Sequence, residues 1–259
     1  MKKIYLGTNW KMHKNLSDSK KYLKKLKSNL NDINFKNFKI FVIPPYTALE
    51  LTQEELRGSN LIYGAQNMHW EQEGAYTAEI SPKMLKDYNI DLVELGHSER
   101  RQYYNENDYD LNKKIQAAYK YNFKPLVCIG EKEKEKDYDL GSEIINLQLK
   151  TIFNNIKKED AKKSWIAYEP VWAIGEGGKP ATPEYVEMIH GHIRAKMTEL
   201  YDAETAAEIV ILYGGSVNYD NALDFITENN VDGLFIGRAA WDADSFSRII
   251  HLIKDNLVE

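Results

Sequence analysis

Short apolar segments rich in β-branched and aromatic residues alternate with helical patterns along the whole chain. Most of these segments end in Gly, Pro or Asn, which is typical of strands. Several are apolar almost throughout, as expected for strands that are covered on both faces. The alternation predicts strands that begin near Ile4, Phe38, Leu61, Asp91, Lys124, Ser164, Ile209 and Gly233.

The intervening segments have the spacing of amphipathic helices. Between the first two strands, apolar residues recur from Leu16 to Leu30 at helical intervals, and most lysines fall on other faces. Thr182 and Pro183 predict the start of another helix, because a hydroxyl N-cap precedes a proline at the first helical position.

Alternating strands and helices imply parallel strands that are joined by crossover helices. About eight such units fit a closed (β/α)₈ barrel, whereas an open doubly wound sheet is the alternative. The open sheet usually has a glycine-rich phosphate loop after its first strand, and residues 7–11 read GTNWK instead. No linker or composition break interrupts the 259 residues, so we expect one barrel domain over residues 1–259.

The charge balance and the single cysteine exclude several classes of protein. The 34 Lys and Arg residues against 39 Asp and Glu residues give a net charge of −5, which does not favour nucleic acid or an anionic membrane as a partner. Cys128 alone allows neither an internal disulfide nor a multi-cysteine metal site. No apolar run has the length of a membrane span or follows the first lysines as in a signal peptide, so we predict a cytoplasmic protein.

Polar and glycine residues follow five of the predicted strands. In a barrel, the carboxyl ends of all strands meet at one rim, where catalytic groups gather. Each residue alone has an ordinary structural explanation, such as a surface lysine, a helix cap or a tight turn. Together they would face one cavity: Asn9, Lys11, His97, Ser98, Glu99, Glu169, Gly214, Gly215, Ser216, Gly237 and Arg238.

This set of residues suits proton transfer next to a carbonyl group. Glu169 can remove a carbon-bound proton, and a neutral His97 can donate a hydrogen bond to the carbonyl oxygen. Lys11 can stabilise the negative charge of the resulting enediolate. No metal is needed if these hydrogen-bond donors suffice. The glycine-rich ends of the seventh and eighth strands suit a phosphate group, because backbone N–H groups are accessible there.

The segment from Pro170 to Thr182 follows the candidate base directly. It has an apolar front, a glycine-rich tip and a proline near each end. It is either a plain connection or a lid that closes over Glu169 and excludes water from the enediolate.

Six motifs of this chain closely resemble those of the triosephosphate isomerase family. They are NWK at residues 9–11, GAQN from Gly64, LGHSERR from Leu95, CIGE from Cys128, YEPVWAIG from Tyr168 and YGGSV from Tyr213. The resemblance spans nearly the whole chain. It implies a TIM barrel that interconverts glyceraldehyde 3-phosphate and dihydroxyacetone phosphate without a cofactor, in glycolysis and gluconeogenesis.

The resemblance also implies a role for each matching residue. Glu169 would be the base, His97 the electrophile and Lys11 the stabilising cation, with Asn9 beside it. Ser98 and Glu99 would support them, and Gly175, Ser216 and Gly237 would offer backbone N–H groups to the phosphate. The family is typically homodimeric: the loop at residues 66–79 would enter a second copy, where Thr77 would reach the partner's active site.

The sequence departs from the family pattern around the phosphate and the lid. Arg238 stands where the family usually has a second glycine, and its side chain would pair with an acid, contact the phosphate or reshape the pocket. The lid is one residue longer than is usual in the family, and Glu176 and Pro180 are among its departures from the family pattern. Ala78 replaces a usual glycine. These patterns resemble a paralogous branch that acts on four-carbon ketose phosphates such as erythrulose phosphate.

Three alternatives therefore remain beside a triosephosphate isomerase. The first is an erythrulose-phosphate isomerase with the same mechanism. The second is a Schiff-base aldolase, for which Lys11 is the clearest candidate nucleophile at a strand end. The third is a phosphate-binding barrel without activity, and the combined presence of Lys11, His97 and Glu169 argues against it.

Overall fold

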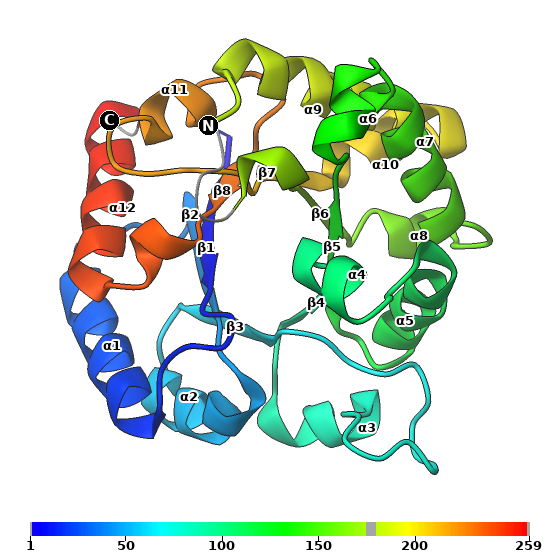
Figure 1. The fold of residues 1–259 in the computed structure, drawn as a ribbon. Coiled ribbons are helices and arrows are strands. Elements are labelled where there is room, and N and C mark those ends of the chain that lie inside the picture. Colours follow the sequence, from blue (N-terminus) through cyan, green and yellow to red (C-terminus); the bar gives the residue numbers. More distant parts are fainter. Residues whose placement is uncertain (1, 175–179, 258–259) are drawn as a thin grey trace.

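Eight parallel strands close into a barrel, in which each strand pairs with the next along the chain and β8 pairs with β1 (Figure 1). The computed structural model describes residues 2–174 and 180–257. The predicted (β/α)₈ barrel is confirmed, and the open sheet is wrong because the β1–β8 pairing leaves no edge. The strands are β1 (Ile4–Asn9), β2 (Phe38–Ile43), β3 (Ile62–Ala65), β4 (Leu92–Leu95), β5 (Lys124–Ile129), β6 (Trp165–Tyr168), β7 (Val210–Tyr213) and β8 (Gly233–Phe235).

Helices surround the barrel and return the chain from the end of one strand to the start of the next (Figure 1). The helix predicted from Thr182 and Pro183 is confirmed, because the Thr182 hydroxyl accepts the Tyr185 N–H at 3.3 Å. The α-helices are α1 (Leu16–Asn29), α2 (Leu49–Leu56), α3 (Pro82–Leu85), α4 (Ser98–Tyr103), α5 (Asp108–Lys120), α6 (Glu133–Asp137), α7 (Gly141–Ile152), α8 (Lys158–Ala161), α9 (Pro183–Leu200), α10 (Ala203–Glu208), α11 (Ala222–Ile226) and α12 (Ala243–Leu257).

The buried apolar residues form two clusters, one inside the barrel and one between the strands and the helices. Alternate residues of each strand face opposite sides of the sheet. A strand therefore contributes to both clusters where its residues on both faces are apolar. The inner cluster includes Phe41, Leu92, Leu126, Trp165 and Phe235, and it closes the barrel beneath the carboxyl ends of the strands. The strand ends therefore stand on a packed floor.

No helix in the described part of the chain is long and apolar enough to cross a membrane.

Candidate active site

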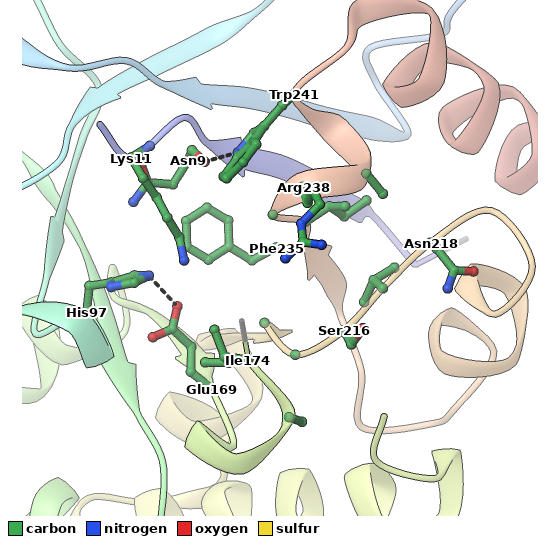
Figure 2. Close-up of a pocket in the computed structure, with 17 residues that line it drawn as sticks. Asn9, Lys11, His97, Glu169, Ile174, Ser216, Asn218, Phe235, Arg238 and Trp241 are labelled. Atoms are coloured by element: carbon green, nitrogen blue, oxygen red, sulfur yellow. Dashed lines mark hydrogen bonds and ion pairs between the residues drawn. The ribbon is translucent and has the colours of Figure 1, made fainter. Parts of the chain in front are cut away.

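A cavity of about 340 Å³ opens at the carboxyl ends of the strands (Figure 2). Residues from the ends of β1, β4, β6, β7 and β8 line it. The structure thus brings together most of the side chains and glycines that we predicted to converge. Those that line the cavity are Asn9, Lys11, His97, Glu169, Gly214, Gly215, Ser216, Gly237 and Arg238.

Lys11 is held in an unfavourable backbone conformation at the end of β1. Its φ of +51° lies in the left-handed region, which costs free energy for a residue with a side chain. The Asn9 side-chain oxygen accepts the Lys11 N–H at 2.6 Å, and Gln66 donates to the same oxygen at 2.9 Å. The Lys11 ammonium donates to a Glu99 carboxylate oxygen at 2.8 Å. These bonds direct the lysine side chain along the cavity, as Figure 2 shows.

His97 presents one ring nitrogen to the cavity. It is the N-cap of α4, and its Nδ1 accepts the backbone N–H of Glu99 at 3.1 Å. A nitrogen that accepts a hydrogen bond carries no proton, so a neutral ring has its proton on Nε2. Nε2 lies 3.7 Å from a carboxylate oxygen of Glu169 (Figure 2). The fold therefore fixes the tautomer that can donate into the cavity.

Glu169 follows β6 and is only 3% exposed. Its backbone N–H donates to the Ile129 carbonyl at 2.7 Å, which ties the residue to the end of β5. One carboxylate oxygen accepts the Ser98 backbone N–H at 3.3 Å, and the other oxygen faces His97. Ser98 thus supports the carboxylate through its main chain, whereas Glu99 supports Lys11 and His97.

Ser216, Gly237 and Arg238 form the opposite side of the cavity. Arg238 begins the short 3₁₀ helix η4 (Arg238–Ala240), and Figure 2 shows its guanidinium directed into the cavity. Behind it, the Trp241 indole N–H donates to the Asn9 backbone carbonyl at 2.9 Å and joins the end of β8 to the end of β1. A cation beside glycine-rich main chain is a suitable environment for an anion.

The first part of the candidate lid is anchored by one buried carboxylate. Trp172, in the 3₁₀ helix η3 (Val171–Ala173), donates its indole N–H to Glu131 at 2.8 Å. The hydroxyls of Tyr168 and Tyr185 donate to the same oxygen at 2.9 and 3.1 Å. Ile174 lines the cavity. The predicted phosphate contact Gly175 and the altered residue Glu176 lie outside the described residues.

Thr77 does not line this cavity, and its loop points away from the barrel (Figure 1). The loop closes with a hydrogen bond from the His69 N–H to the Ile80 carbonyl at 2.8 Å, and Thr77 at its tip is exposed. Ala78 has a φ of +75°, a region that favours glycine. The residue that replaces a usual glycine here therefore keeps a glycine-like backbone at a cost in strain.

Three residues that support the site were not predicted from the sequence: Glu94, Gln66 and Trp241. Glu94 is fully buried in β4 directly beneath the cavity, and it accepts the Asn9 side-chain N–H at 2.6 Å. A charged residue inside the apolar strand LVEL was the available signal, because such a residue is buried only at a cost. Gln66 lies in the GAQN motif, but its contacts with the end of β1, like that of Trp241, could not be predicted from local sequence.

Glu94, Cys128 and Glu169 have ligand atoms within 4.8 Å of one another, the arrangement closest to a metal site among the described residues. Burial raises the pKa of the Glu94 carboxyl and of the Cys128 thiol well above their ordinary values. Both groups must lose a proton to bind a cation, so this cluster is a poor metal site.

Comparison with known proteins assigns the family. The family model described as triosephosphate isomerase matches residues 4–253. The chain belongs to the triosephosphate isomerase family. The chain is 41% identical to the triosephosphate isomerase of Fusobacterium nucleatum over 250 residues, which cover 96% of this chain and 98% of that protein. It is 42% identical to the triosephosphate isomerase of Borreliella burgdorferi over 252 residues, which cover 97% and 99%.

A solved structure agrees with these sequence matches. The crystal structure of triosephosphate isomerase from Bartonella henselae matches with a TM-score of 0.87 and 31% identity, and the match covers 97% of this chain and 99% of that one. The predicted family and the predicted isomerase activity are confirmed, and the chain is an enzyme of this family. The relatives' names do not favour the four-carbon alternative.

Proposed function

We propose that the chain interconverts glyceraldehyde 3-phosphate and dihydroxyacetone phosphate through an enediolate, with Glu169 as the base. The observation that carries the proposal is the 3.7 Å approach of His97 Nε2 to the Glu169 carboxylate across a cavity that Lys11 also lines. A carboxylate, a proton-bearing imidazole nitrogen and an ammonium are the three groups that this reaction requires.

The reaction begins when Glu169 removes a proton from the carbon next to the carbonyl group. The Nε2–H of His97 donates to the carbonyl oxygen, so negative charge that develops there meets a fixed hydrogen-bond donor. The Lys11 ammonium stabilises the same charge. His97 gives its Nε2 proton to the former carbonyl oxygen and takes up the proton of the neighbouring hydroxyl, which becomes the new carbonyl. Glu169 then returns its proton to the former carbonyl carbon, so both enzyme groups end in their starting states.

The phosphate would lie on the opposite side of the cavity. Ser216 and Gly237 would hold it through backbone N–H groups, together with Gly175, and Arg238 would hold it through its guanidinium. Asn9 would contact the reacting part of the substrate beside Lys11. The cavity lining supports this division, because Glu169 and His97 occupy one side and Arg238 and Ser216 lie away from them (Figure 2).

A homodimer is part of the proposal, with Thr77 reaching the second copy. Its support is the exposed position of residues 71–79 within the loop at residues 66–79, and of apolar side chains such as Tyr76 and Met84, which are 46% and 52% exposed. Sedimentation equilibrium should give twice the 30.0 kDa chain mass, and Thr77→Arg should reduce it to one chain. The cytoplasmic location stays a prediction from the sequence.

The substrate is tested by measuring kcat/KM for glyceraldehyde 3-phosphate and for an erythrulose phosphate side by side. We expect fast turnover of the triose phosphate and poor turnover of the tetrulose phosphate. The reverse ratio would assign the chain to four-carbon substrates. If neither substrate reacts, borohydride reduction with a sugar phosphate distinguishes the remaining cases: covalent labelling of a lysine indicates an aldolase, and no labelling indicates a binding protein.

A further inference from the structure

Glu94 is a carboxyl group that the proposed mechanism does not use, although it contacts Asn9 in the site. Its side chain is fully buried. One oxygen accepts the Asn9 side-chain N–H at 2.6 Å, and the other lies 3.7 Å from the Cys128 sulfur. It therefore joins the end of β1 to the interior of β5, directly beneath the residues that line the cavity.

The surroundings of Glu94 do not suit a negative charge. One amide N–H and one weak thiol donor are its hydrogen-bond partners among the described residues, too few to replace the water that a buried carboxylate loses. Glu169 already places a second carboxylate within 4.8 Å. Two carboxylates this close in a dry site do not both ionise readily.

The charged and titratable groups around Glu94 lead to the same conclusion. Lys11, from the end of β1, is the nearby cation, and its ammonium is bound to Glu99 at 2.8 Å. Among the described residues, Cys128 from β5 and Glu169, which follows β6, are titratable groups that face it. Burial and the negative charge of Glu169 together raise the pKa of the Glu94 carboxyl well above its ordinary value.

Asn9 depends on this contact for its orientation. Its side-chain oxygen already accepts the N–H of Lys11 and the amide of Gln66, and its N–H₂ group donates to Glu94. The amide is thus held at both ends, and the oxygen end fixes the strained turn that carries Lys11. Loss of the Glu94 acceptor would free the amide to rotate and would weaken the hold on that turn.

We propose that Glu94 is a positioning residue, a neutral carboxylic acid that holds Asn9 and the Lys11 turn without adding a second negative charge beside the base. This inference rests on the proposed function, in which Asn9 and Lys11 contact the substrate and Glu169 takes the proton. It separates two properties of Glu94, because the acceptor oxygen is required and the negative charge is not.

The kinetic test compares Glu94→Gln with Glu94→Leu. Gln keeps the acceptor oxygen and is neutral. The Glu94→Gln variant should therefore retain a kcat/KM within about threefold of the wild type, and the acid limb of the pH profile of kcat/KM should not move. Leu removes the acceptor, so kcat/KM should fall by about tenfold or more, mainly through kcat, because the Lys11 ammonium stabilises charge that develops during the reaction. Glu54→Leu, at an exposed position in the second half of α2, is the matched control.

A double-mutant cycle tests whether Glu94 acts through Asn9. In an Asn9→Ala background, Glu94→Leu should change kcat/KM by less than about twofold, because the group that it positions is gone. An equal loss in both backgrounds would overturn the proposal. So would a Gln variant as impaired as the Leu variant, since that result would mean that the negative charge is required.

Protein stability provides a readout that does not depend on activity. A Glu94 that stays neutral when folded but ionises when unfolded costs the wild type more stability as the pH rises above the ordinary carboxyl pKa. The stability advantage of Glu94→Gln over the wild type, from urea unfolding, should therefore grow between about pH 5.5 and about pH 8. An advantage independent of pH would overturn the neutral state. Absent turnover in the wild type would refute only the proposed function.

Discussion

At the scale of single residues, hydrogen bonds to the backbone decide what each site group can do. The Glu99 N–H occupies Nδ1 of His97 and leaves the proton on Nε2, where a substrate oxygen would lie. The Ser98 N–H holds one oxygen of Glu169 and leaves the other facing the cavity. The chemistry of these side chains is thus set by main-chain groups that immediately follow β4.

Arg238 is the residue whose replacement tests the phosphate side of the cavity. Arg238→Met removes a charged donor from the lining but keeps an aliphatic chain, so we expect KM for the sugar phosphate to rise by about tenfold or more with a smaller change in kcat. The competitive inhibition constant of inorganic phosphate should rise in parallel.

Arg248→Met provides the comparison for a general effect of lost charge, since Arg248 is exposed on α12. Steady-state kinetics of both variants and the wild type distinguish a specific effect of Arg238 from a general effect of lost charge. An Arg238→Met enzyme with an ordinary KM would show that this guanidinium does not bind the phosphate.

At the scale of elements, the base is positioned by the close approach of β5 and β6. A Cβ added at Gly130 would lie 1.9 Å from the Glu169 carbonyl oxygen. Only glycine therefore allows the segment after β5 to approach the segment after β6 this closely. The Glu169 N–H then bonds to Ile129 at 2.7 Å. This contact is the structural reason why the base sits at a defined depth in the rim.

Gly130→Ala should therefore displace the base as well as destabilise the fold. Gly233→Ala is the matched control, because a Cβ there would lie 2.0 Å from the Tyr5 carbonyl at the opposite end of the barrel from the site. Both changes should lower the free energy of unfolding by about 1–3 kcal/mol. Only Gly130→Ala should also lower kcat, by about tenfold or more, in assays at a temperature where both variants are folded. Equal kcat values in the two variants would contradict this account.

The elements themselves could be predicted from the sequence, but some contacts between them could not. The strands are short apolar segments with clear ends, and Thr182 with Pro183 predicts the start of α9. Local patterns were therefore sufficient to predict these elements. Trp241 reaches the Asn9 carbonyl across 232 positions of sequence, and no local pattern encodes such a contact. The direction of Arg238 was open for the same reason, because it depends on how η4 follows β8.

At the scale of the whole molecule, stability should depend on pH through a histidine that does not line the cavity. His190 in α9 is fully buried against Tyr168, and its Nδ1 bonds to the Asn230 carbonyl at 3.2 Å. Burial lowers the pKa of His190 from 6.5 to about 4. The unfolded chain therefore binds a proton at a higher pH than the folded one does.

The contribution of His190 to stability is complete above its unfolded pKa of 6.5 and is lost as the pH falls towards about 4. The loss amounts to about 3 kcal/mol over this range. His190→Gln removes the titration but keeps a donor for the carbonyl, so its free energy of unfolding should fall less steeply below pH 6.5. Denaturant unfolding of both proteins at several pH values measures the difference. Parallel curves would show that His190 is not responsible.

The whole-molecule account rests on Glu169 as the group that moves the proton between carbons, and one kinetic comparison tests it directly. Glu169→Gln keeps the size of the side chain and its acceptor oxygen but removes its basicity. With glyceraldehyde 3-phosphate, we predict that kcat falls by several orders of magnitude while KM changes little, because the base acts mainly in the transition state. Turnover near the wild-type rate in this variant would contradict the central claim and assign the base to another residue.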